Sequence, residues 1–319
     1  MKQLKTEQRN PRTRGLDLKN SLGIVRALNQ EDATVARAVR RELPAIARAV
    51  DAVVASMQQG GTLLYVGAGS SGRLAVLDAA EIPPTFVISR KWVRALIAGG
   101  RRALENAVEG AEDSPANGAK DLQKAGLKKG DVVVGIAASG TTPYVLGALA
   151  AARQAGATVV GITSNKKSPL SRAADIKIAP NTGQEAVAGS TRLKAGTSQK
   201  MVLNLLSTAV MVRLGRVYEN WMIHLTLTNE KLERRATRIL REATGASAST
   251  AAHALRQTAH DLPAAIVMLK SGVNAADAKS ELTRQRGNAR LAIESLSKAR
   301  HHKTSKGKSH GPVSNSRRP

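Results

Sequence analysis

Residues 62–72, which read TLLYVGAGSSG, decide the fold. Leu63 to Val66 form a short apolar run without polar alternation, which predicts a strand buried on both faces, and the glycines that follow predict a tight turn. A second strand is expected at TFVIS (85–89). The order of strand, turn and helix recurs in DVVVGIAASGTT (131–142), TVVGITSN (158–165) and DIKIAP (175–180). The sequence therefore predicts an α/β fold with a doubly wound, Rossmann-like parallel sheet and helices on both faces.

Helical patterns flank the predicted sheet. Residues 17–58 have apolar positions at helical spacing and predict two helices before the first strand, and 197–240 predict a long helical stretch. A small C-terminal helical bundle is expected from three patterns, at 249–260, 263–271 and 275–296. We therefore expect three parts: a catalytic domain with an N-terminal helical arm at 1–245, a helical domain at 246–297, and a disordered basic tail at 298–319.

Composition excludes several classes of function. The chain has no cysteine, which rules out a disulfide scaffold, a thiolate zinc site and a cysteine nucleophile. Aromatic residues make up only 2% of the 319 residues, which argues against binding nucleic acid by base stacking. The basic N-terminus is not followed by an apolar run, and 18 consecutive apolar residues occur nowhere. We therefore expect a cytoplasmic protein that does not enter a membrane.

The formal net charge of +25 raises the question of a polyanionic partner. Seven of these charges lie in the acid-free tail at 298–319, and the remaining +18 are spread along the chain. A spread of this kind favours a generally cationic surface over a nucleic-acid site. We therefore expect no nucleic-acid partner, although the basic tail could bind polyanions.

The first glycine-rich turn, Gly67 to Gly72, matches the dinucleotide-binding pattern G-x-G-x-x-G after a strand. That pattern also needs an acidic residue about 20 positions further on, to hold the ribose hydroxyls. Here Arg90 and Lys91 follow the second predicted strand instead. The sequence thus disfavours NAD and leaves NADP open, because NADP enzymes use a basic residue near this position.

A second turn, Ser139-Gly140-Thr141-Thr142, follows another predicted strand and precedes Pro143. Hydroxyl groups and the free N–H groups of a helix N-terminus can bind a phosphate without a lysine. The simpler interpretation is that these hydroxyls only cap helices. Because two such turns follow parallel strands, we expect both at one edge of the sheet, where they could hold one phosphorylated ligand.

Several long segments resemble the N-acetylmuramic acid 6-phosphate etherases, members of the sugar isomerase (SIS) superfamily. The segments that carry the resemblance are TEQRNPRTRGLD, YVGAGSSGRLAVLDAAEIPPTF, AASGTTPYV, GSTRLKAGTSQKMVLNLLSTAVMVRLG and TNEKLERRA. The resemblance runs from about Leu4 to about Ser297 and implies an SIS-type sheet with a small C-terminal helical domain. Gln184 departs from it, since the family usually has proline there. Animal glucokinase regulatory proteins are related in fold without this activity.

The resemblance implies a carbon–oxygen lyase that removes D-lactate from N-acetylmuramic acid 6-phosphate in cell-wall sugar recycling, as a homodimer and without metal or cofactor. It places the catalytic carboxylates at Glu81 and Glu112. Together with the two turns it gives the candidates for substrate binding: Gly69, Ser70, Ser71, Ser139, Gly140, Thr141, Thr142, Glu185, Ser190 and Lys194.

Two glutamates suffice for this chemistry, because the ether oxygen is β to the aldehyde of the ring-opened sugar and the proton on C2 is acidic. We expect Glu81, just past a helix and beside two prolines, to be the acid, with its carboxyl kept partly protonated by apolar surroundings. We expect Glu112 to be the base, although spacing alone does not separate it from Glu109 and Asp113. An exposed helix end is the plain alternative for both glutamates.

Other interpretations stay open from the residues alone. Lys194 and Arg192 could neutralise the anionic substrate or could pair with acids in the core. A ketose–aldose isomerase, a nicotinamide-dependent reductase and a non-catalytic sugar-phosphate sensor are the competing functions on such a fold.

Overall fold

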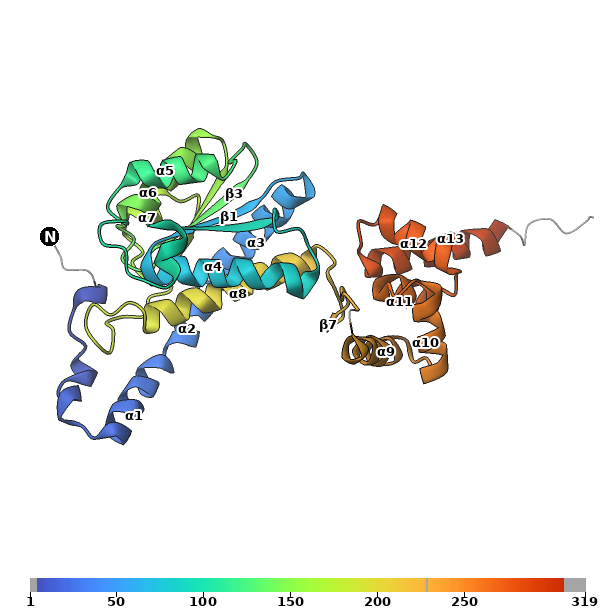
Figure 1. Ribbon diagram of the computed structural model, residues 1–319, viewed down its shortest axis with the longest axis horizontal. Coiled ribbons are helices and arrows are strands. Elements are labelled where there is room, and N and C mark those ends of the chain that lie inside the picture. The colour runs from blue at the N-terminus through green and yellow to red at the C-terminus, as the bar shows by residue number, and fades with distance from the viewer. Residues whose placement is uncertain (1–4, 228, 307–319) are drawn as a thin grey trace, which may run out of the picture. The chain divides into compact units, whose positions relative to one another are not determined.

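The computed structural model describes residues 5–227 and 229–306, which form two compact units. The first unit ends at Val210 and the second begins at Met211, apart from Thr85–Val87, which group with the second. Figure 1 shows the ribbon of each unit. No helix among the residues just given is long and apolar enough to cross a membrane.

A five-stranded parallel sheet forms the centre of the first unit. Its strands lie side by side in the order β2-β1-β3-β4-β5. Their bounds are Leu63–Gly67 for β1, Val93–Ile97 for β2, Val132–Ile136 for β3, Thr158–Ile162 for β4 and Ile176–Ile178 for β5. The predicted α/β fold with a parallel sheet is confirmed.

Helices cover both faces of this sheet, which explains the unbroken apolar runs of the strands. Leu64 and Val66 of β1 point to one face and pack with Leu149 and other residues of the helices on that side. Tyr65 points to the other face, where its hydroxyl reaches Asp78. All five residues of β1 and of β3 are buried.

The helices of the first unit arise from local signals at their ends. Ser114, for example, caps the helix that begins at Pro115, by accepting a hydrogen bond from the backbone N–H of Asn117. The helices are α1 Ser21–Asp32, α2 Val35–Arg40, α3 Leu43–Gln58, α4 Gly69–Phe86, α5 Pro115–Lys124, α6 Pro143–Gln154, α7 Pro169–Ala173 and α8 Lys194–Arg213. Short 3-10 turns lie at Lys5–Glu7, Pro11–Thr13, Leu16–Leu18 and Gly100–Leu104.

Three predictions about elements were wrong. Residues 17–58 form three helices, α1, α2 and α3, where two were expected. The segment 85–89 is not a strand, because α4 continues through Pro83 and Pro84 to Phe86, and the second strand is Val93–Ile97 instead. The long helix expected at 197–240 is interrupted after Arg213 by a short hairpin of β6 (Val217–Tyr218) and β7 (Trp221–Met222).

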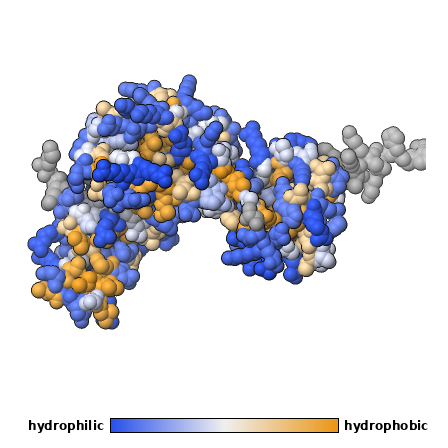
Figure 2. All heavy atoms as spheres, in the orientation of Figure 1, coloured by the Kyte–Doolittle hydropathy of each residue, from blue (hydrophilic) through white to orange (hydrophobic). Residues whose placement is uncertain are grey.

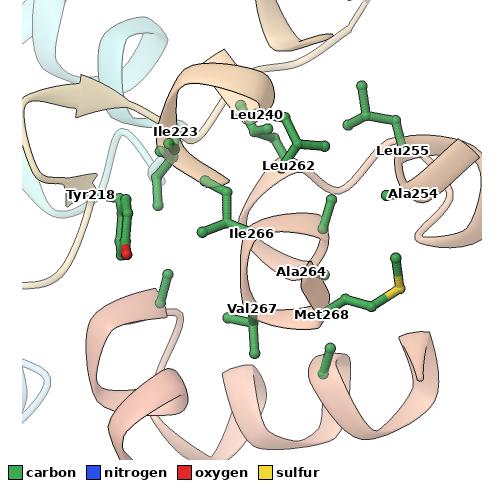
Figure 3. Packing of buried hydrophobic residues seen from close by; sticks show 14 of the residues in the cluster. Tyr218, Ile223, Leu240, Ala254, Leu255, Leu262, Ala264, Ile266, Val267 and Met268 are labelled. Carbon is green, nitrogen blue, oxygen red and sulfur yellow. The ribbon is translucent and has the colours of Figure 1, made fainter. Parts of the chain in front are cut away.

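The second unit is a helical bundle around one apolar core. Its helices are α9 Glu230–Thr244, α10 Ala248–Gln257, α11 Leu262–Ser271, α12 Ala275–Arg284 and α13 Ala289–Lys306. Figure 3 shows Ile266 and Val267 of α11 at the centre, with Leu240, Leu255 and Tyr218 around them. The stretch predicted as one pattern at 275–296 is divided into α12 and α13 at Gly287, whose φ is +84°.

The compact units do not coincide with the predicted domain limits. The predicted boundary lies at 245, whereas α9 contacts α10 and α11 and groups with the second unit. The expected tail begins at 298, but α13 continues to Lys306, and the rest of the tail, 307–319, lies outside the described residues. The functional division into three domains stays a prediction.

Candidate functional site

The first turn joins β1 to α4 and requires glycine for two different reasons. Gly69 has a φ of +52°, in the left-handed region that side chains disfavour. A Cβ atom at Gly67 would lie 2.7 Å from the backbone nitrogen of Gly72, so the turn closes tightly onto the start of the helix. Ser70 is partly exposed and Ser71 is buried. The N-terminal end of α4 is thereby placed at the carboxyl end of β1.

The second turn follows β3 and is held by the segment that follows the neighbouring strand, β4. Gly140 has a φ of +73°, and a Cβ there would lie 2.2 Å from Oγ of Ser168. Asn165 donates from Nδ2 to the carbonyl oxygen of Ser139 at 3.0 Å. The backbone N–H of Leu170 donates to the carbonyl oxygen of Gly140, also at 3.0 Å. The segment after β4 therefore fixes the shape of this turn.

The hydroxyl groups of the second turn do not simply cap α6. Oγ of Ser139 accepts from the backbone N–H of Thr141 at 3.2 Å and from its Oγ1 at 2.9 Å. Thr142, at the N-cap position of α6, makes no side-chain capping hydrogen bond. The alternative of plain N-capping therefore does not account for Thr142.

Both turns lie at the same edge of the sheet. In the register of the parallel strands, Gly67 at the end of β1 is level with Ile136 at the end of β3. Strand β1 lies between β2 and β3, so the chain crosses over in opposite directions from this point. Ligands of open α/β sheets bind outside the carboxyl ends of the strands at such a position.

Glu112 lies at this edge too, in the loop between β2 and α5. Its backbone carbonyl accepts a hydrogen bond from the N–H of Tyr144 in the first turn of α6, at 2.9 Å. Arg73 of α4 donates from Nε to the carbonyl of Leu104 at 3.0 Å and from Nη2 to that of Asn106 at 3.1 Å, so the same loop is tied to the first turn. The side chain of Glu112 is exposed.

Glu81 is placed differently from the sequence-based prediction. It lies inside α4, twelve residues after Gly69, and not beyond the end of the helix. Its side chain is exposed, although Ile82 next to it is buried, so the apolar surroundings expected for its carboxyl are missing within one chain. The structure brings the backbone of Glu112 to the start of α6, whereas it puts Glu81 toward the far end of α4.

A buried carboxyl, which the sequence did not mark as special, anchors α4. Asp78 accepts hydrogen bonds from the hydroxyl of Tyr65 at 3.0 Å and from Ser207 Oγ of α8 at 3.0 Å. Asn204 Nδ2 donates to the same carboxyl at 3.1 Å. Burial raises the pKa of Asp78. The cluster holds α4 against β1 and α8, one helical turn before Glu81.

Lys194 pairs with an acid in the core, which was the second of its two interpretations. Its side chain is 0% exposed, and Nζ donates to Oε2 of Glu31 at 2.6 Å. Arg12 and Asn10 also donate to Glu31. The pKa of Glu31 falls to about 2, first because of the hydrogen bond from Arg12. The ammonium group of Lys194 is thus engaged within the chain.

Glu185 caps the start of α8. One of its carboxylate oxygens accepts from the backbone N–H of Lys194 and the other from that of Ala195, each at 2.9 Å. The residue is fully buried, and burial raises its pKa. Ser190 lies in the partly exposed loop before α8, and its N–H donates to the carbonyl of Val187 at 3.0 Å.

The loop that carries Glu185 and Ser190 is fastened by the N-terminal segment. Asn10 Nδ2 donates to the carbonyl of Gln184 at 3.3 Å, and Thr13 Oγ1 donates to that of Ala186 at 2.8 Å. The residue that departs from the family pattern, Gln184, is thus held through its backbone.

The residues that follow β2 are basic, where the NAD-binding pattern has an acid. After β2, which ends at Ile97, the chain continues through one alanine and two glycines to Arg101 and Arg102. Arg101 and Arg102 therefore disfavour NAD for the same reason as Arg90 and Lys91 did after the predicted strand at 85–89. Within 5–227 and 229–306, no three His, Cys, Asp or Glu side chains are grouped as a metal site.

Two family models match the first unit. The model described as the glucokinase regulatory protein N-terminal SIS domain matches residues 45–153, and the SIS domain model matches residues 103–209. Together these matches include both turns, Glu81 and Glu112.

Curated relatives match almost the whole chain. A protein of Enterobacter sp. (strain 638), named N-acetylmuramic acid 6-phosphate etherase, is 50% identical over 91% of this chain and 98% of its own length. A protein of the same name from Yersinia pestis (strain Pestoides F) is 51% identical over 90% of this chain and 98% of its own length.

Solved structures are similar at lower identity. A putative phosphosugar isomerase of Bacteroides fragilis covers 63% of this chain and 95% of its own, at 21% identity and a TM-score of 0.48. A phosphoheptose isomerase of Neisseria gonorrhoeae covers 60% of this chain and 100% of its own, at 17% identity and a TM-score of 0.48.

Proposed function

The chain belongs to the N-acetylmuramic acid 6-phosphate etherase family, and from this we propose that it cleaves the lactyl ether of N-acetylmuramic acid 6-phosphate. The products are N-acetylglucosamine 6-phosphate and D-lactate, formed with one molecule of water. The observation that carries the proposal is the meeting of two hydroxyl-bearing turns and Glu112 at one edge of the sheet.

The reaction proceeds by elimination and addition. In the ring-opened sugar, a base removes the proton from C2, the C3–O bond breaks, and an acid protonates the departing lactate oxygen. Water then adds to C3 of the unsaturated aldehyde while C2 regains a proton. We assign removal of the C2 proton to Glu112 and protonation of the departing lactate oxygen to Glu81.

The two turns bind the phosphate. A dianion is stabilised at the starts of α4 and α6, where the helix dipoles are positive. Ser70, Ser71 and the hydroxyls of the second turn add neutral donors, with Gly69 and Gly140 giving the backbone its shape. Because the ammonium group of Lys194 is engaged by Glu31, we give Lys194 and Glu185 the task of holding the loop that bears Ser190.

We further propose that the protein acts as a homodimer in the cytoplasm. Apolar side chains are exposed on the N-terminal arm, with Leu18 86%, Leu22 57% and Val25 61% exposed. Figure 2 shows apolar side chains, in orange, gathered where α1 lies in Figure 1. A monomer seldom leaves such a cluster uncovered, and a second copy of the chain would bury it.

Removing the hydroxyls of the turns should weaken substrate binding. Ser70→Ala, Ser139→Ala and Thr141→Ala should each cost about 1 to 3 kcal/mol of binding free energy, because a charged partner loses a hydrogen bond. The dissociation constant of the substrate is measured by calorimetry. Ser247→Ala, which removes the cap of α10, serves as the control and should leave affinity unchanged. Unchanged affinity in all three site variants would mean that the turns are structural only.

Activity should survive a chelator. A base and an acid are enough for elimination beside an aldehyde, so the route described above has no step that a divalent ion must perform. D-lactate release is followed after dialysis against EDTA and compared with an untreated sample. A loss of activity that added Mg²⁺ or Zn²⁺ restores would contradict this mechanism.

A further inference from the structure

The second unit contains a cavity that the proposed reaction does not use. Its volume is about 490 Å³, which is within the range of small-molecule sites. The described residues that line it all belong to the second unit. Three of them, Arg216, His224 and Arg286, have side chains that can carry a positive charge, and Asp261 is the acid among them.

The short hairpin brings two of these side chains together. Strands β6 and β7 pair antiparallel, with Val217 level with Met222. Arg216 comes directly before β6 and His224 follows β7, so both lie at the same end of the hairpin. A Cβ atom at Gly287 would lie 3.8 Å from Nη1 of Arg216 and 3.8 Å from Cε1 of His224. The guanidinium and the imidazole therefore both reach the backbone of Gly287.

The loop between α12 and α13 brings a second guanidinium to the cavity. Arg286 has a φ of +54°, in the left-handed region that side chains disfavour, and Gly287 follows with +84°. The N–H of Arg286 donates to the carbonyl of Thr283 at 3.0 Å, and that of Gly287 donates to the carbonyl of Leu282 at 2.8 Å. Such strain is concentrated at functional sites, where it fixes the place of a side chain. Here it places an exposed arginine at the cavity wall.

The electrostatics of this wall favour an anion. Burial lowers the pKa of Arg216, so a negative charge beside its guanidinium would be stabilising. Burial and then the charge of Arg216 lower the pKa of His224 to about 4, which leaves the imidazole neutral near neutral pH. Its Nε2 is buried and has no hydrogen-bond partner within 5–227 and 229–306. Asp261 is engaged as the cap of α11, where Oδ1 accepts from the N–H of Ala264 at 3.0 Å.

The shape of the cavity indicates the class of anion. A phosphate group has three terminal oxygens, which can accept from two guanidinium groups and from Nε2–H of a neutral imidazole. A carboxylate has only two oxygens, and one arginine satisfies both. Apolar side chains that suit the carbon part of a phosphate ester complete the wall: Leu225, Leu262, Pro263 and Leu282.

We propose that this cavity is a second ligand site, which binds a small phosphomonoester between Arg216 and Arg286 with His224 as a neutral donor. The organic part of the ester lies against the leucines of the wall. The site is separate from the two glycine-rich turns, which belong to the first unit.

Nuclear magnetic resonance of the full-length protein with ¹⁵N-labelled imidazole rings tests this site. The chain has six histidines, and His224→Gln identifies the signal of His224. Phenyl phosphate at neutral pH should shift this signal until the site is saturated. Inorganic phosphate should give the same shift at about tenfold lower affinity, since it leaves the apolar wall uncovered. Equal affinities would contradict a site for an organic phosphate.

Removing the arginines should weaken binding of phenyl phosphate. Arg286→Gln and Arg216→Gln should each raise its dissociation constant about tenfold or more, because the phosphate loses a charged hydrogen bond. Arg286 is exposed, so its replacement leaves the fold intact and decides the outcome if the Arg216 variant does not fold. Arg256→Gln, which removes an exposed arginine from α10 in the same unit, is the matched control and should leave the affinity unchanged.

Ser139→Ala separates this site from the turns. The variant should leave the phenyl phosphate titration of His224 unchanged, since Ser139 belongs to the first unit. Three outcomes would overturn the proposal: no saturable shift of His224, wild-type affinity in Arg286→Gln, or a shift that is lost in Ser139→Ala.

Discussion

Replacing Glu112 with glutamine is expected to lower turnover by about 10² to 10⁴ while substrate binding persists, because the amide keeps the size of the side chain and loses the proton transfer. Glu81→Gln should have a loss of similar size. The two lesions should differ in exchange of the C2 proton. Loss of the base should abolish exchange with solvent deuterium, whereas loss of the acid should permit exchange without release of lactate.

Measuring exchange by NMR and lactate by a coupled assay on the same samples assigns the two roles. Glu109→Gln and Asp113→Asn are the matched controls in the same loop and should retain activity. Near-normal turnover in Glu112→Gln, with a loss in either control, would move the base to that neighbour. Near-normal turnover in Glu81→Gln would remove it from the mechanism.

Glu31→Gln is expected to destabilise the fold by about 3 to 5 kcal/mol, since it leaves the buried ammonium of Lys194 without its counterion. Unfolding by urea measures the change. The double variant Glu31→Gln, Lys194→Met removes both charges and should recover much of the loss. If the double variant were as unstable as the sum of the single ones, the ion pair would not be the source of the effect.

The same group makes stability depend on pH. The pKa of Glu31 is about 2 in the folded chain and 4.5 as the ordinary value, so the unfolded chain binds the proton first as pH falls. The stability that Glu31 contributes is therefore full above pH 4.5 and disappears as the pH approaches 2. Glu31→Gln should lack this part of the acid transition.

The strands and turns could be predicted because the residues that determine each of them lie within one short segment of the sequence. The run at 62–72 and the run at 131–142 carry both the buried strand and the residues that the turn requires, and Gly140 cannot be replaced without a clash. The prediction of a strand at 85–89 was wrong because the end of α4 is not determined by its local sequence alone. The helix was expected to end before Glu81, but α4 continues to Phe86, with Ile82 and Phe86 buried.

Tertiary partners far apart in sequence could not be predicted from periodicity. Glu31 and Lys194 are 163 residues apart, and the sequence around either residue does not indicate that the other is its partner. The same holds for Asp78 and Ser207, which are 129 residues apart. For Glu81 the resemblance implies a catalytic role, whereas its place inside α4 is given only by the structure.

The most direct test of the central claim is the reaction of wild-type protein with N-acetylmuramic acid 6-phosphate in water labelled with ¹⁸O and deuterium. Elimination followed by addition breaks the C3–O bond, so we expect D-lactate without the label and a sugar phosphate carrying ¹⁸O at C3 and deuterium at C2. Label in the lactate, a product without deuterium at C2, or no release of lactate would contradict it.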